Sequence, residues 1–260
     1  MLRAKITRAG QDAFKNRSRR KETDFWLGNH FRLVTSAATA HATIELSLPV
    51  PDRLGKPGLP RKFHPAIVRQ NSFAGLKIIV AITGASGALY AQRLLDNLDP
   101  RAHDIQVVIT SYGQAVIAQE LPDGLRLPAG VKMHNVKSMN APFASGSNAF
   151  DAMVVIPCSM GTLGRIAHGT SEDVLLRAAD VMLKERKKLI LVPRETPLNL
   201  VHVKNFELLL QAGTTILPAN PCFYTGPKSL VQVVDTVVAR VLDDLGVPQK
   251  LMPRWQEEKE

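Results

Sequence analysis

Arg194 and Glu195 form the adjacent pair with the clearest potential for chemistry. They follow the apolar run Lys188–Val192, which has the composition of a buried strand. A cation and a carboxylate at the end of a strand can bind an anion and transfer a proton in the same place. A salt bridge without a chemical role would give the same pattern, so other residues must decide between the two interpretations.

A second candidate is the stretch Thr83–Gly87, which reads TGASG and joins a strand-like run to a helix-like run. Small residues allow a tight turn and let the backbone approach a ligand closely. The free amide groups and the positive end of the following helix favour an anion. The stretch therefore predicts an anion site. Its GxxG spacing leaves the ligand open, and a tight turn without a ligand is the alternative.

Other charged and reactive side chains say less on their own. Arg177 and Lys184 are seven residues apart and share one face of a predicted helix, which is usually a solvated basic face. Arg240 could bind phosphate through its planar guanidinium, but most arginines are merely exposed. Cys158 is expected to be a small buried residue and not a nucleophile. No Cys/His spacing typical of zinc occurs, so we expect no metal.

The elements that must position these residues alternate between strand and helix from Leu76 onward. Strands are predicted at Leu76–Ile82, Ile105–Thr110, Asp151–Pro157, Lys188–Val192 and Thr214–Leu217. Helices are predicted after Gly87 and at Ser111–Glu120, Ser159–His168, Glu172–Arg186, Leu198–Ala212 and Lys228–Leu245, with Leu121–Ala149 irregular. Repeated strand–helix units predict a parallel sheet with helices on both faces. Ligands in such sheets bind at the carboxyl ends of the strands.

The charge of the chain is unevenly distributed. Of the 260 residues, 1–74 contain 14 Lys/Arg and 5 Asp/Glu, whereas 75–260 contain 19 and 18, so the net charge of +10 lies almost entirely before the first strand. A balanced body argues against a nucleic-acid partner. Two cysteines are too few for a disulfide framework. No apolar run approaches the length of a transmembrane helix, so we expect no membrane partner.

These patterns divide the chain into two parts. Residues 1–75 form a basic, proline-containing extension that we expect to be mostly disordered. Residues 76–260 form the folded domain. The expected location is cytoplasmic, with a mitochondrial location as the alternative if the extension is a transit peptide.

Six motifs, in the same order, resemble the flavin prenyltransferase family, the UbiX family, including its phenylacrylic acid decarboxylase-associated members. The resemblance covers Leu76–Trp255. The motifs are TGASG at Thr83–Gly87, ASGSNAFDAMVVIPCSMGTLGRIAHG at Ala144–Gly169, LLRAADVMLKER at Leu175–Arg186, RETPL at Arg194–Leu198, FYTGPKSL at Phe223–Leu230 and PRW at Pro253–Trp255.

The resemblance implies an α/β fold, a flavodoxin-like Rossmann three-layer sandwich with a parallel sheet, in a homo-oligomer that is a dodecamer. It implies an enzyme, a transferase that binds FMN without a metal. Such an enzyme joins the dimethylallyl group of dimethylallyl monophosphate to N5 and C6 of reduced FMN. The product, prenylated FMN, serves UbiD-type decarboxylases.

The resemblance also assigns site residues. The implied catalytic residues are Glu195 as acid–base group, Ser86 in moving the N5 proton, and Lys184. The implied FMN contacts are Gly84, Ala85, Ser86, Ser111, Ser159, Met160, Gly161, Thr162 and Arg194. The implied contacts of the prenyl substrate are Arg177, Lys184, Arg194, Tyr224, Arg240 and Trp255, whose ring could shield an allylic cation.

Three alternative functions share part of this pattern. An FMN-dependent cysteine decarboxylase shares the fold, but the turn Pro157–Thr162 lacks the asparagine expected there. A short-chain dehydrogenase would need Tyr224 and Lys228 on one helix face, which Gly226 and Pro227 prevent. A non-catalytic flavin-binding protein remains an alternative, although both Glu195 and Lys184 are present.

Overall fold

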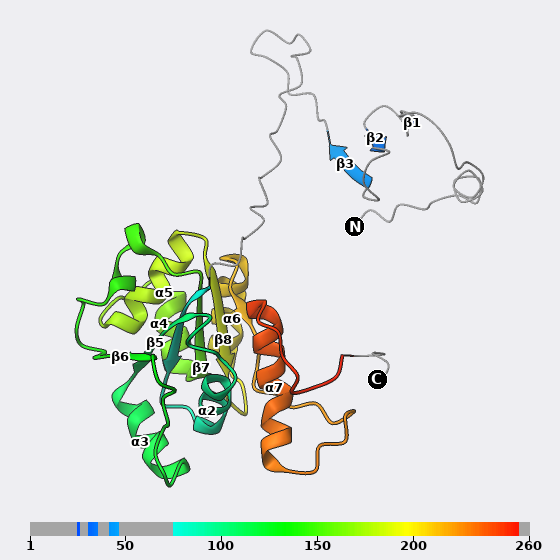
Figure 1. Ribbon diagram of the computed structural model, residues 1–260. Helices are drawn as coiled ribbons and strands as arrows, with labels where there is room; N and C mark the ends of the chain where they lie inside the picture. Colours follow the sequence, from blue (N-terminus) through cyan, green and yellow to red (C-terminus); the bar gives the residue numbers. More distant parts are fainter. Residues whose placement is uncertain (1–24, 27–30, 36–41, 47–74, 255–260) are drawn as a thin grey trace. The chain divides into compact units, whose positions relative to one another are not determined.

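The computed structural model describes residues 25–26, 31–35, 42–46 and 75–254 of the chain (Figure 1). The chain divides into two compact units, Met1–Gln70 and Asn71–Glu260. In the first unit, three strands pair antiparallel in the order β1-β2-β3: β1 (Phe25–Trp26), β2 (Phe31–Thr35) and β3 (Ala42–Leu46). The prediction that residues 1–75 are mostly disordered falls largely outside the described residues and stays a prediction.

The second unit is built on a six-stranded parallel sheet with the order β6-β5-β4-β7-β8-β9. Its strands are β4 (Lys77–Ile82), β5 (Asp104–Ile109), β6 (Lys132–His134), β7 (Ala152–Cys158), β8 (Lys188–Pro193) and β9 (Thr215–Ile216). All five predicted strands are present. Without β6, the order β5-β4-β7-β8-β9 is that of flavodoxin-like sheets.

The strand β6 was missed, and the prediction that Leu121–Ala149 is irregular throughout was wrong at this point. Lys132 and Met133 are exposed and His134 is half-buried, so the segment has no buried apolar run. It is a strand because it pairs with β5, with Gln106 opposite Lys132 and Val107 opposite Met133. A pairing partner so distant in sequence leaves no local signal.

Six α-helices follow the strands at the predicted positions, within about two residues at each end. They are α2 (Ala88–Asp96), α3 (Ser111–Glu120), α4 (Met160–Ala167), α5 (Val174–Lys184), α6 (Leu200–Gln211) and α7 (Leu230–Leu245), with the short 3₁₀ turns η1 (Pro142–Ala144) and η2 (Gly146–Asn148). Side-chain oxygens cap the first turns of all but α2. Such caps contribute about 1 kcal/mol each and fix where each helix begins. None of the helices in the described part of the chain is long and apolar enough to cross a membrane.

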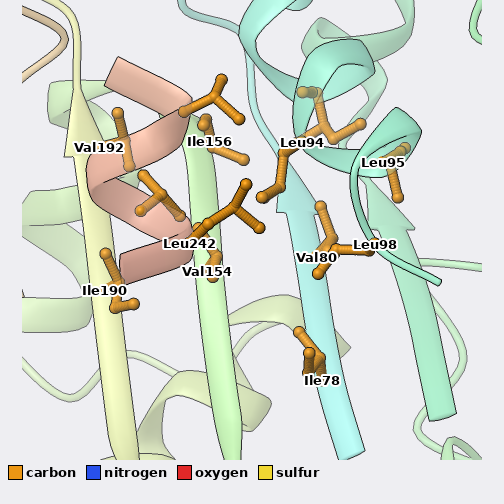
Figure 2. Close-up of a cluster of buried hydrophobic side chains, with 14 of the residues drawn as sticks. Ile78, Val80, Leu94, Leu95, Leu98, Val154, Ile156, Ile190, Val192 and Leu242 are labelled. Atoms are coloured by element: carbon orange, nitrogen blue, oxygen red, sulfur yellow. The ribbon is translucent and has the colours of Figure 1, made fainter. Parts of the chain in front are cut away.

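Alternate residues of each strand face opposite layers of helices. Ile78 and Val80 of β4 pack with Leu94 of α2 and Leu242 of α7 on one face (Figure 2). The residues between them belong to a second buried cluster, which packs against α4 and α5 on the other face. Burial of each large side chain contributes roughly 1.5–3 kcal/mol. The second unit is thus the expected three-layer α/β/α sandwich of the flavodoxin-like type.

The order of the strands locates the crevice where a ligand binds. From β4 the chain first moves to β5 on one side and later returns to β7 on the other side. The loops that leave β4 and β7 therefore diverge over the carboxyl ends of the strands, and this divergence opens a crevice. Thr83–Gly87 and Ser159–Thr162 lie in or just after these two loops.

Candidate active site at the carboxyl edge of the sheet

Thr83 joins the two loops that border the crevice. Its buried hydroxyl donates to the carbonyl of Pro157 at 2.8 Å and accepts the amide hydrogen of Ser159 at 2.8 Å. The backbone amide of Thr83 also donates to the Pro157 carbonyl, at 3.3 Å. The loops after β4 and β7 are therefore fixed relative to each other before any ligand binds.

The start of α2 corrects the first expectation about Thr83–Gly87. The amides of Gly87 and Ala88 donate to the carboxylate of Glu120, at 2.8 and 2.7 Å. Gly87 has φ of 120°, a conformation that favours glycine and turns the chain into the helix. The expected anion site at this helix terminus is thus filled by the last residue of α3. The amides of Gly87 and Ala88 are therefore not open to a ligand.

Ser86, Glu120 and Arg194 form one hydrogen-bonded cluster. The Ser86 hydroxyl donates to the Glu120 carboxylate, and Arg194 Nε donates to the Ser86 carbonyl at 3.1 Å. Burial alone would raise the pKa of Glu120. The hydrogen bonds from Ser86, Gly87 and Ala88, with the charge of Arg194, outweigh burial and hold this pKa below its ordinary value. The cluster is a fixed anion between a hydroxyl group and a cation.

Tyr90 lies beside the same cluster on α2. Burial raises the pKa of its phenol, and the nearby charge of Arg194 opposes this shift. A β-carbon at Gly87 would lie 2.8 Å from the Tyr90 ring, so the ring packs directly on the Gly87 backbone. Tyr90 therefore supports the turn that carries Ser86.

The start of α4 provides the open amides that α2 lacks. Ser159 caps the helix, because its hydroxyl oxygen accepts from the Thr162 amide at 3.3 Å and donates to the Thr162 hydroxyl at 3.0 Å. The amides of Met160 and Gly161 in the first turn have no acceptor within the helix. A β-carbon at Gly161 would meet nothing within 4 Å. This surface can accept a phosphate or the edge of a flavin ring. The residues present therefore fit FMN.

Not every predicted FMN contact offers its side chain. Met160 and Thr162 are buried, so Met160 could contact a ligand only through its backbone. Thr110 caps α3 by accepting from the Gly113 amide at 3.0 Å, which leaves exposed Ser111 as the hydroxyl at this rim. A β-carbon at Gly84 would lie 2.4 Å from the Tyr112 β-carbon, so this glycine makes room for a side chain of α3.

Cys158 ends β7 and is fully buried. Burial raises the pKa of its thiol to about 12. A thiol with so high a pKa stays protonated at neutral pH, as expected for a structural cysteine.

Glu195 lines a cavity of about 290 Å³ next to the cluster. Its carboxylate accepts from the Thr196 amide at 3.0 Å. The cavity is lined by Pro193, Arg194, Glu195, Thr196, Leu198, Phe206, Pro218, Ala219 and Asn220. Arg194 thus belongs both to the cavity and to the Ser86 cluster. Glu195 can contact a ligand that binds in the cavity.

Arg177 and Lys184 lie on α5 next to the two 3₁₀ turns. Arg177 donates to the Ala144 carbonyl at 3.0 Å and to Asp180 at 2.8 Å, and Lys184 pairs with Glu185 at 2.5 Å. Lys184 ends α5 four residues before β8 begins, whereas Glu195 follows the carboxyl end of β8. Six strand residues span about 20 Å, so Lys184 and Glu195 of one chain do not share a site.

Tyr224 and Arg240 line a second cavity, of about 430 Å³. Asp243 of this cavity pairs with Arg240 at 3.9 Å and with Arg254 at 3.7 Å. Trp255 follows Arg254 directly and lies outside the described residues. The predicted site residues that the structure describes therefore fall into three groups: the carboxyl ends of the strands, α5, and this second cavity.

Glu120 is the residue of the candidate site that the sequence analysis missed. It is the last residue of α3 and is 33 residues from Gly87, whose amide it accepts. The available signal was the position of α3 directly after β5, since that helix borders the same crevice.

Among the described residues, no group of three His, Cys, Asp or Glu side chains could hold a metal ion.

Comparison with known proteins shows relatives that match about 70% of the chain. The model of the family described as Flavoprotein matches residues 68–242. A flavin prenyltransferase UbiX from Halalkalibacterium halodurans is 45% identical over 193 residues, which cover 70% of this chain and 94% of that protein.

Solved structures agree with the sequence comparison. A dodecameric FMN-dependent UbiX-like decarboxylase from Escherichia coli O157:H7 has a TM-score of 0.67 and 39% identity, covering 70% of this chain and 100% of the other. AnUbiX (PadA1), solved with FMN and dimethylallyl pyrophosphate, has a TM-score of 0.66 and 36% identity, covering 71% and 100%. On these matches and on its fold, the chain belongs to the UbiX family of flavin prenyltransferases, within the flavoproteins.

Proposed function

We propose that the chain transfers the dimethylallyl group of dimethylallyl monophosphate to N5 and C6 of reduced FMN. The observation that carries the proposal is the cluster of Ser86, Glu120 and Arg194 at the crevice, directly beside the cavity of Glu195. Together these groups can orient an anion, take up a proton and stabilise a leaving phosphate. Flavin prenylation, the reaction of the family to which the chain belongs, requires all three of these actions.

FMN fits the residues at the sheet edge. The amides of Met160 and Gly161 and the guanidinium of Arg194 can hold its polar groups, and Gly84 and Ala85 provide the adjacent backbone. When bound, reduced FMN supplies the two nucleophilic atoms, N5 and C6. Ser86, which contacts Glu120, is the proposed residue that receives the proton released at N5 and passes it on. The ionised Glu120 keeps the Ser86 hydroxyl in one orientation.

Loss of phosphate from the allylic substrate is the step that needs cations. Breaking its C–O bond leaves positive charge on carbon and negative charge on phosphate, and fixed cations lower that barrier. Arg194, Lys184, Arg177 and Arg240 are the proposed phosphate-binding residues, with the Tyr224 hydroxyl beside them. Glu195, which lines the cavity beside Arg194, is the proposed group that protonates the leaving phosphate or removes the proton from C6. Trp255 is the proposed shield of the cationic carbon.

One chain does not bring all these groups together, so we propose that copies of the chain complete one another. Lys184 precedes the amino end of β8 and Glu195 follows its carboxyl end, so the two lie at opposite ends of the parallel strands. A neighbouring copy can place its α5 over the crevice and also exclude water. The dodecamer of the Escherichia coli relative supports a homo-oligomer of this kind here. We further propose that a UbiD-type decarboxylase uses the product, and that the chain acts in the cytoplasm.

The test is the mass of the flavin after turnover. Purified protein is incubated without oxygen with reduced FMN and dimethylallyl monophosphate, and with the pyrophosphate in a parallel reaction. The extracted flavin should gain one five-carbon prenyl unit. A flavin that stays bound but unmodified with both donors would overturn the proposed activity.

A further inference from the structure

The second cavity, of about 430 Å³, is lined by two arginines, of which the sequence analysis singled out only one. Arg254 lines this cavity together with Arg240 and Tyr224. The side chains of the two arginines are 73% and 66% exposed. Arg254 belongs to the PRW motif at Pro253–Trp255, from which the proposed function uses only the tryptophan. The motif therefore contains a cation to which the proposed function gives no role.

Asp243 makes the charge of this cavity depend on Arg254. Its carboxylate lies 3.9 Å from Arg240 and 3.7 Å from Arg254, and its side chain is only 20% exposed. These three are the charged residues that line the cavity, two positive and one negative, with a net charge of +1. Without Arg254, the charges of Arg240 and Asp243 would cancel. A phosphate monoester, with roughly 1.5–2 negative charges at pH 7, would then meet a cavity without net positive charge.

One side chain holds the backbone that leads to Arg254. The side-chain carbonyl of Gln249 accepts the amide hydrogens of Leu251 and Met252, at 2.8 and 3.1 Å. The side-chain amide of Gln249 donates to the Met252 carbonyl at 3.2 Å. Pro253 comes next, and its ring fixes φ directly before Arg254. The backbone that carries this guanidinium is therefore held in position before a ligand binds.

The turn Gln249–Met252 also contacts the loop that carries Tyr224. The Met252 sulfur lies 3.8 Å from the Tyr224 hydroxyl and 3.6 Å from the Cys222 sulfur. The Cys222 amide donates to the Thr236 hydroxyl of α7 at 3.2 Å. The turn, the Tyr224 loop and α7 are thus joined around the cavity.

We propose that Arg254 is a further residue that binds the phosphate of the prenyl donor, and that Asp243 holds its guanidinium beside that of Arg240. The planar guanidinium group matches phosphate oxygens. The carboxylate between the two guanidiniums offsets their mutual repulsion, so both can face one phosphate. The inference rests on the proposed function, in which the cavity of Tyr224 and Arg240 receives this phosphate.

The experiment measures the binding of dimethylallyl monophosphate to the full-length protein loaded with FMN, by isothermal titration calorimetry. The flavin is kept oxidised, so that no turnover occurs during the titration. Arg254→Gln removes the charge and should raise the Kd of the donor at least about tenfold, ~1.4 kcal/mol. Arg254→Lys restores the charge and should recover most of the affinity. The Kd of FMN should stay at the wild-type value in both variants.

The matched control is Arg126→Gln. Arg126 is 68% exposed and lies 3.9 Å from the carboxylate of Asp96, so its ion pair is of the same kind as that of Arg254. It lines neither of the two cavities and should bind the donor as wild type does. The inference is overturned if Arg254→Gln binds the donor as tightly as wild type, if Arg126→Gln weakens binding equally, or if Arg254→Lys binds as weakly as Arg254→Gln.

These outcomes are separate from those of the flavin assay. Donor binding that depends on Arg254, in a protein that leaves reduced FMN unmodified, would support the inference and overturn the proposed function. A wild type that prenylates FMN, with an Arg254→Gln variant that keeps the Kd and the KM of the donor, would do the reverse.

Discussion

At the scale of single residues, Glu120 decides how the crevice can be used. Its carboxylate takes up the two amides at the start of α2, so the positive end of that helix is already neutralised. The negative charge of Glu120 disfavours a ligand phosphate at the amides of Gly87 and Ala88. The first turn of α4 offers open amides, so we propose that an anion binds on the β7 side of the crevice and that Ser86 serves proton transfer.

The lowered pKa of Glu120 predicts a stability difference that depends on pH. The variant Glu120→Gln should be less stable than wild type at pH 7 by roughly 1 kcal/mol, a value discounted for exposure. A lowered pKa means that the contribution is present above the ordinary value of 4.5 and is lost as the pH falls through the folded-state pKa. Denaturant unfolding at pH 7, 5 and 3 measures the difference. An equal difference at pH 3 and pH 7 would contradict the role of the charge.

At the scale of elements, the first turn of α4 is the proposed cradle for FMN. Its N-cap is internal, between Ser159 and Thr162, so the cap does not compete with a ligand for Met160 and Gly161. The β4 and β7 loops are already joined through Thr83. Little has to be reorganised for binding, which favours affinity.

Filling this cradle should weaken flavin binding without unfolding the protein. Gly161→Leu points a side chain into space where a β-carbon meets nothing within 4 Å. The Kd for FMN should rise at least about tenfold, ~1.4 kcal/mol, while the thermal midpoint stays near that of wild type. Flavin fluorescence titration measures the affinity. His168→Leu, at the exposed far end of α4, is the control and should bind as wild type.

Sequence patterns predicted those elements that have local causes. The strands β4, β5, β7 and β8 are continuous buried runs, and the helices begin at capping residues such as Ser159 and Asn199. The strand β6 and the position of Glu120 depend on contacts with segments about 30 residues away, so no local pattern predicts them. The separation of Lys184 from Glu195 likewise appears only when the helix and strand directions are known.

At the scale of the whole molecule, the three groups of site residues imply that one chain is not the functional unit. The sheet edge, α5 and the second cavity each carry part of the proposed site. Under the proposed function, the cations that bind the substrate phosphate come from more than one copy. The unit of activity is then the assembly.

Mixing two inactive variants tests this directly. Lys184→Ala and Glu195→Gln should each prenylate FMN poorly. When they are co-expressed and form mixed oligomers, a site that takes Lys184 and Glu195 from different copies is intact in roughly a quarter of cases. Activity should therefore return toward that fraction. Mixed oligomers that stay as inactive as the separate variants would show that each chain holds a complete site.

The two-part organisation of the chain leads to a further prediction. Both buried clusters of the sheet are formed by residues of the second unit. Deleting residues 1–74 should leave the thermal midpoint and the prenylation rate of the domain within error of the full chain. Calorimetry and the flavin mass assay measure these. A truncated protein that unfolds earlier or loses activity would show that the extension contributes to the domain.

The double hydrogen bond of Thr83 also limits which sequences can keep this crevice. One oxygen donates to the Pro157 carbonyl and accepts from the Ser159 amide. A serine could form both bonds, whereas valine, with the same shape, could form neither. During divergence residue 83 could change between the two hydroxyl residues, but a change to valine would remove both side-chain bonds and leave only the backbone bond from its amide to the Pro157 carbonyl. What must be kept at residue 83 is thus the hydroxyl oxygen that joins the two walls of the crevice, and not the shape of the side chain.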